Sequence, residues 1–70
     1  MKAITGYWSN CDSRGEVVRV MIKDEDAMMA CNRNTQIAWT VSQAVREFNG
    51  FLKSFGYEID HVEHWNGDEY

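Results

Sequence analysis

The stretch from Thr40 to Gly56 constrains the fold of this 70-residue chain more than any other part of it. Its apolar residues recur at spacings of three and four, which is typical of a helix with one buried face. The polar residues of the stretch fill the opposite side of that helix. We therefore expect the helix to pack its apolar face on a sheet. The seven residues of that face are Val41, Ala44, Val45, Phe48, Phe51, Leu52 and Phe55.

Both ends of this helix are marked in the sequence. Thr40 and Gln43 match a capping box, in which two side chains satisfy the free backbone N–H groups of the first turn. Gly56 is the expected left-handed residue after the last turn. The pair Asn49–Gly50 costs about 1 kcal/mol relative to alanine. Because the apolar spacing continues unshifted through this pair, we expect one continuous helix.

Two segments before the helix predict a β-hairpin. Lys2–Ser9 and Glu16–Lys23 have the composition of strands, and the polar loop between them contains turn residues. The second strand alternates, with Val18, Val20 and Ile22 on one face and Arg19 and Lys23 on the other.

The segment Asp24–Asn34 admits two interpretations. The preferred one is a short helix that Asp24 caps and that Asn32 or Asn34 ends. Its inward residues are then Ala27, Met28 and Cys31. The competing interpretation is a loop followed by a short strand at Thr35–Trp39.

A third strand is predicted at Tyr57–Trp65, followed by a loose tail at residues 66–70. The apolar alternation of this strand slips by one between Ile59 and Val62, which indicates a bulge or an edge position. The expected fold is a single α+β domain of two layers. In it, one long helix and one short helix accompany a three-stranded antiparallel sheet of order 2-1-3, whose third strand pairs beside the first.

The net charge of −4 is concentrated at one end of the chain. Residues 1–53 carry every Lys and Arg and sum to +1, whereas residues 54–70 carry five acidic residues and sum to −5. A chain charged in this way is repelled by nucleic acid and by anionic membranes. We therefore expect a basic protein surface as its partner, and neither nucleic acid nor membrane.

Location and redox state follow from what the sequence lacks. No apolar run is long enough for a signal peptide or a membrane-spanning helix, so a cytoplasmic protein is expected. Two cysteines are too few for a disulfide scaffold. We expect free thiols, with a single disulfide as the alternative.

His61 and His64 are the residues best suited to metal chemistry, with Cys11 or Cys31 as a further ligand. Histidines three apart in a strand point to opposite faces unless a bulge intervenes, which disfavours zinc binding. A Cys–His nucleophile is disfavoured too, because Asp12 beside Cys11 opposes thiolate formation. We expect no cofactor, no metal and no enzymatic activity, and keep a His/Cys metal-binding protein as an alternative.

The acid-rich end of the chain is the candidate site for partner binding. Carboxylates there, interleaved with aromatic residues, have the chemistry to engage Lys and Arg side chains of a partner. The alternative is that they only keep a small protein soluble. The candidate partner-binding residues are Glu58, Asp60, Glu63, Trp65, Asp68, Glu69 and Tyr70.

With a single compact α+β domain, no catalytic motif and the acid-rich segment 57–70, the chain resembles the small acidic inhibitors encoded by bacteriophages, anti-CRISPR proteins among them. The resemblance implies a non-enzymatic protein that blocks a nucleic-acid-handling complex in the host cytoplasm, as a monomer or a weak homodimer. The alternative is a structural or regulatory module that self-associates through Trp8, Trp39 or Trp65.

Overall fold

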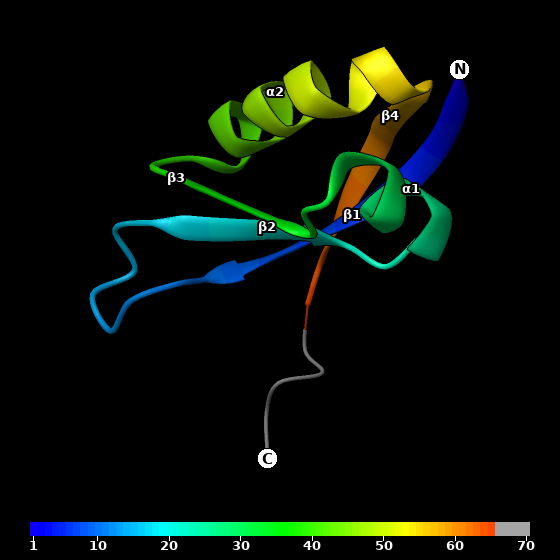
Figure 1. Cartoon of the computed structure of the whole chain (residues 1–70). Coiled ribbons are helices and arrows are strands. Elements are labelled where there is room, and N and C mark those ends of the chain that lie inside the picture. Colours follow the sequence, from blue (N-terminus) through cyan, green and yellow to red (C-terminus); the bar gives the residue numbers. More distant parts are fainter. Residues whose placement is uncertain (66–70) are drawn as a thin grey trace.

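The computed structural model describes residues 1–65 and shows an α+β fold with a four-stranded mixed sheet and two helices (Figure 1). Residues 66–70, expected above to form a loose tail, lie outside the described residues. The elements in chain order are β1 (Lys2–Asn10), β2 (Val18–Ile22), α1 (Glu25–Cys31), β3 (Thr35–Ala38), α2 (Val41–Leu52), the 3₁₀ turn η1 (Lys53–Phe55) and β4 (Tyr57–His64).

The sheet differs from the predicted one in strand number and in direction. Its order is β3-β2-β1-β4, and the last strand lies beside the first as predicted. However, β4 runs parallel to β1, so the prediction of an antiparallel pair was wrong. The reason is β3, which pairs antiparallel with β2 and reverses the chain once more before α2. One additional strand reverses the direction of every element that follows it. The helix α2 therefore crosses the sheet in the direction opposite to the predicted one, and β4 returns parallel to β1.

The two interpretations of the segment before the long helix are both correct in part. A short helix forms at Glu25–Cys31, and a strand also forms at Thr35–Ala38. Asp24 caps the helix by accepting a hydrogen bond from the Ala27 N–H at 2.9 Å. Asn32 ends it with left-handed backbone at φ 57°. A left-handed Asn turns the chain sharply enough for a strand to follow within three residues.

One face of the sheet forms the core together with both helices, and Figure 1 shows α2 lying along the sheet. Phe48 and Leu52 of α2 and Val20 of β2 are its largest fully buried side chains. Met28 and Cys31 pack partly buried against it, as predicted. The remaining buried apolar residues of this cluster are Ile4, Ile22, Ala27, Ala38, Ala44 and Ile59.

The long helix has the predicted ends but a narrower buried face. Thr40 accepts a hydrogen bond from the Gln43 N–H at 3.1 Å, whereas the Gln43 side chain bonds to Glu47 instead of completing the capping box. The helix is continuous through Asn49–Gly50, and its last turn tightens into η1 before Gly56 at φ 88°. Phe51 is 43% exposed and Phe55 50% exposed, so the prediction that all seven apolar residues face the sheet was wrong. Phe55 belongs to the tightened last turn, which rotates its ring away from the core. Phe51 lies before that turn, and Arg33 stacks over its ring at 3.9 Å from the centroid.

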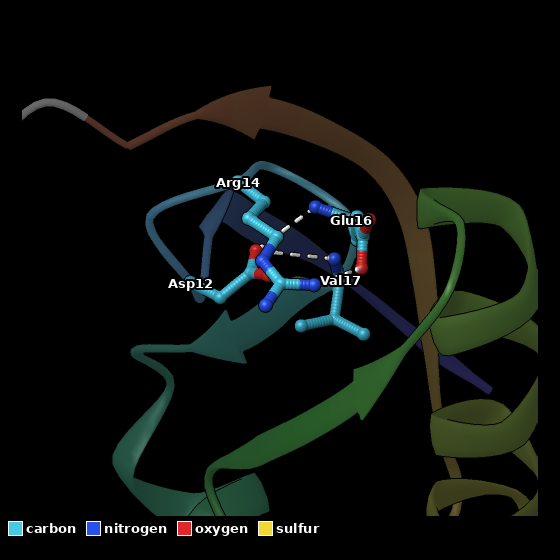
Figure 2. A network of polar contacts seen from close by, with 4 residues as sticks. All are labelled: Asp12, Arg14, Glu16 and Val17. Atoms are coloured by element: carbon cyan, nitrogen blue, oxygen red, sulfur yellow. Dashed lines mark hydrogen bonds and ion pairs between the residues drawn. The ribbon is translucent and has the colours of Figure 1, made fainter.

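The hairpin loop between β1 and β2 is organised by one carboxylate (Figure 2). Asp12 Oδ1 accepts hydrogen bonds from the N–H groups of Glu16 at 2.9 Å and Val17 at 3.4 Å. The Asp12 carbonyl accepts a further bond from the Gly15 N–H at 3.2 Å. The exposed ion pair between Arg14 and Glu16, at 3.9 Å, adds little by comparison. The side chain of Asp12 therefore holds the turn that the sequence predicts.

An ion pair ties the start of β1 to the start of α1. Lys2 Nζ lies 3.1 Å from Asp24 Oδ2. The hydrogen bond from the Ala27 N–H and then the bond from Lys2 hold the pKa of the Asp24 carboxyl below its ordinary value. The hydrogen bond to Asp24 raises the pKa of Lys2 in turn. Both shifts show that this pair favours its charged state in the folded protein.

Gly50 offers a test of the continuity of α2. A Cβ added there meets no atom within 4 Å. We expect Gly50→Ala to raise the free energy of unfolding by about 1 kcal/mol, because alanine is the better helix former. Gly50→Pro should lower it by about 3 kcal/mol, because proline removes a helical hydrogen bond. Urea denaturation followed by circular dichroism measures both. Wild-type stability in the proline variant would mean that the helix ends near Phe48.

Asp24 makes the stability of the protein depend on pH. A carboxyl whose pKa is lowered on folding contributes stability above its ordinary pKa of 3.8, and this contribution is lost as the pH falls through the folded-state value. Asn also caps helices but carries no charge. We therefore expect the free energy of unfolding of Asp24→Asn to fall less than that of the wild type between about pH 5 and about pH 2. Urea titrations at both pH values test this, and equal losses would contradict it.

Candidate protein-binding edge

The strand that carries the predicted site residues lies at the edge of the sheet. β4 has β1 on one side, and on the other side no strand from residues 1–65 pairs with it. Ile59 lies opposite Ile4, but the next residue of β1, Thr5, lies opposite His61 instead of Asp60. The register of the two strands therefore shifts by one residue after Ile59. The bulge predicted between Ile59 and Val62 is therefore confirmed at Asp60.

This bulge decides which side chains face the helices. Tyr57, Ile59 and Val62 pack on the core side of the sheet. Beyond the bulge, alternation brings His61 and Glu63 to the opposite, open face, beside Thr5 and Tyr7 of β1. An unbroken alternation would have placed Val62 among the solvent-facing residues.

Three of the predicted carboxylates follow one another along this edge. Glu58, Asp60 and Glu63 are all exposed. His61 lies between the last two, with Nδ1 3.6 Å from Asp60 Oδ2 and Nε2 3.3 Å from Glu63 Oε2. A histidine in this place supplies positive charge only when it is protonated.

Within residues 1–65, His61 is the only ion-pair partner of these three carboxylates, and no Lys or Arg pairs with them. Lys2 is paired with Asp24, and Lys23 lies on the open face over the rings of Tyr7 and Trp65 without forming an ion pair with these carboxylates. Apart from His61 beside Asp60 and Glu63, these carboxylates have no ion-pair partner within residues 1–65, so an external cation can pair with them. The other predicted acidic residues, Asp68 and Glu69, and the aromatic Tyr70 lie outside the described residues.

Trp65 is not placed as an exposed anchor at this edge. It lies half-buried on the open face, where its ring meets Tyr7 edge-on at a centroid distance of 5.9 Å. Lys23 Nζ sits over both rings, 3.8 Å from the Trp65 centroid and 4.8 Å from that of Tyr7. This stacked cation already occupies the ring face that an external Lys or Arg would use.

The residues considered for metal or nucleophilic chemistry are separated by the fold. His61 lies on the open face, whereas His64 stacks on Trp8 on the core side, with ring centroids 4.6 Å apart. Cys11 is exposed in the hairpin loop, and Cys31 donates to the Arg33 carbonyl; both are free thiols. In the described part of the chain, no three His, Cys, Asp or Glu residues gather into a group that could hold a metal.

Sequence reasoning missed the role of Asn49. Its side-chain oxygen accepts the Ile59 N–H at 2.8 Å and so connects α2 to the first half of β4. In the sequence this residue was only part of the Asn–Gly pair that weakens the helix. In the sequence, Asn49 borders the apolar face of the predicted helix next to Phe48, and this position is the signal that could have indicated a polar side chain in contact with the sheet.

Comparison of the chain with protein-family models, with curated proteins and with solved structures gives no match. Within the range that the structure describes, neither helix combines the length and the apolar character needed to cross a bilayer.

Proposed function

We propose that this protein is a non-enzymatic binding protein that inhibits a nucleic-acid-handling complex, such as a bacterial CRISPR complex, by occupying a basic surface of it. The observation that carries the proposal is the row of carboxylates on β4. Glu58, Asp60 and Glu63 are exposed at a sheet edge, and no Lys or Arg of residues 1–65 pairs with them.

Such a row is complementary in charge to protein surfaces that bind nucleic acid. Those surfaces carry clusters of Lys and Arg that contact phosphates, and carboxylates compete for the same side chains. Complementary charge steers the encounter and speeds association, and salt weakens that attraction. Binding through the β4 carboxylates should therefore be fast and should weaken with salt. It should also compete with the nucleic acid that the partner normally binds.

Charge reversal on β4 tests this function. We expect the triple variant Glu58→Lys, Asp60→Lys and Glu63→Lys to keep its fold and to lose its partner, because like charges then face each other. The measurement is a pull-down from a bacterial lysate at about 0.05 M and about 0.5 M salt. Captured proteins are identified by mass spectrometry and then assayed for nucleic-acid binding with and without the protein.

A matched control reverses three acidic residues elsewhere. Glu16→Lys, Glu25→Lys and Asp26→Lys change the net charge equally, and all three side chains are exposed away from β4. This control should retain the partner, and circular dichroism should show the same fold for both triple variants. Equal capture by the β4 variant, or equal loss by the control, would contradict binding through this edge.

Self-association is a second candidate, and one exposed side chain favours it. Trp39 is 66% exposed just after β3, and neighbouring Ile37 is 50% exposed. Of the three tryptophans proposed above for this role, Trp8 and Trp65 are half-buried. Exposed aromatic residues of this size are enriched at protein interfaces.

We expect any self-association to depend on Trp39 more than on Trp65. Light scattering over a range of concentrations measures the mass of the wild type, of Trp39→Ala and of Trp65→Ala. An increase of mass with concentration that only Trp39→Ala abolishes would support this candidate. A monomeric mass at every concentration would exclude it.

A further inference from the structure

In its second half, β4 has backbone groups that point away from β1 and that no strand of residues 1–65 pairs with. At the two ends of the strand, the Lys2 N–H donates to the Gly56 carbonyl at 2.9 Å and the Trp65 N–H donates to the Trp8 carbonyl at 2.7 Å. Backbone groups alternate in direction along a strand. Counting back from Trp65, Glu63 points its N–H and C=O toward β1, whereas Val62 and His64 point theirs away from the sheet.

The first half of the same edge is closed by a side chain. The Ile59 N–H, which also points away from β1, donates a hydrogen bond to Asn49 Oδ1 of α2 at 2.8 Å. In Figure 1, β4 begins beside the end of α2 and then runs away from it. The segment from Val62 to His64 is therefore where the edge can accept another strand. We call this segment the free edge.

The geometry points to strand addition as the mode of binding, a conclusion that rests on the proposed function. We propose that the partner supplies an extended basic segment that pairs antiparallel with the free edge as a fifth strand. Main-chain hydrogen bonds from Val62 and His64 then provide affinity, and side chains provide specificity. Antiparallel pairing is chosen because it is the more stable arrangement per residue.

The two faces of β4 specify the composition of the added segment. Residues directly opposite Val62 and His64 lie on the core side of the sheet, beside the apolar Val62 and the Trp8–His64 pair. Residues between them lie on the open face, beside the Glu63 carboxylate. A segment that alternates apolar and basic side chains places apolar side chains beside Val62 and basic side chains beside Glu63. A block of basic residues makes favourable contacts on the open face only.

A second copy of this chain does not fit the free edge. Two β4 strands paired antiparallel about Glu63 would bring their two Glu63 carboxylates together on the open face. Like charges opposite each other destabilise a strand pair, and charged residues at edges are a common protection against such self-pairing. The acidic edge therefore excludes its own copy while it attracts a basic strand.

Short peptides test strand addition in the intact protein. The probes are a blocked hexapeptide of alternating lysine and valine and a blocked hexapeptide of three lysines followed by three valines. Titration of ¹⁵N-labelled protein, followed by NMR at low salt, gives the dissociation constants. We expect the alternating peptide to bind about tenfold more tightly, because only it pairs with both faces.

Methylation of the peptide nitrogens tests the backbone contact and leaves the protein unaltered. In the proposed pairing the valine N–H groups face β4 and the lysine N–H groups face solvent. N-methylation of the valines should weaken binding about tenfold, and N-methylation of the lysines should leave it nearly unchanged. The opposite result, or no effect of either, would overturn the proposed pairing.

A pair of variants tests the same contact from the protein side. His64→Pro removes the outward N–H, whereas His64→Ala keeps it and removes the same imidazole ring. Proline is tolerated at edge positions whose N–H faces solvent. We expect weakened binding in the proline variant alone. If that variant does not fold, the methylated peptides with wild-type protein decide the outcome.

The outcomes separate strand addition from the charge contact itself. If both unmethylated peptides bind equally and the triple reversal on β4 abolishes their binding, strand addition is wrong and the proposed function stands. If neither peptide binds at low salt, both are wrong. Preference for the alternating peptide, lost on valine methylation, supports both.

Discussion

The packing of α2 on the sheet is the interaction on which the rest of the structure depends. Phe48 and Leu52 are fully buried in a core that also contains side chains from all four strands. Burying two large apolar side chains contributes several kcal/mol, a large share of the stability available to a chain of 70 residues. This contact holds the helix on the sheet in the direction that the reversal at β3 sets. It thereby also fixes where the chain leaves the helix and where β4 begins.

Much of this could be predicted from the sequence, because the helix is specified by local signals that all agree. The Thr40 cap, the apolar spacing around Phe48 and the left-handed Gly56 are each local, and each is found in the structure. The error in the sheet arose from β3, a strand of four residues whose side chains are mostly half-exposed. Such a strand has little apolar alternation, so the sequence offered it only as the competing interpretation of this segment. Its pairing with β2 is a long-range contact that local patterns do not encode.

The candidate site was predicted in part. The acidic character of the last strand and its bulge could be read from the sequence, and the structure places Glu58, Asp60 and Glu63 together at an exposed edge. What could not be read was the parallel pairing with β1. The role of Trp65 was also unforeseen, because its contacts with Tyr7 and Lys23 depend on residues distant in the chain. The backbone hydrogen bond between Asn49 and Ile59 depends equally on the tertiary fold.

The alternation of backbone groups along β4 determines whether a partner strand can be added there, and amide hydrogen exchange of the isolated protein tests it most directly. We expect slow exchange for Ile59, Glu63 and Trp65, whose N–H groups point to Asn49 or to β1, and fast exchange for Val62 and His64. Slow exchange at Val62 and His64, or the inverse alternation, would contradict it. Either result would show that the outer edge of β4 is already occupied or that the strand pairs with β1 in another register.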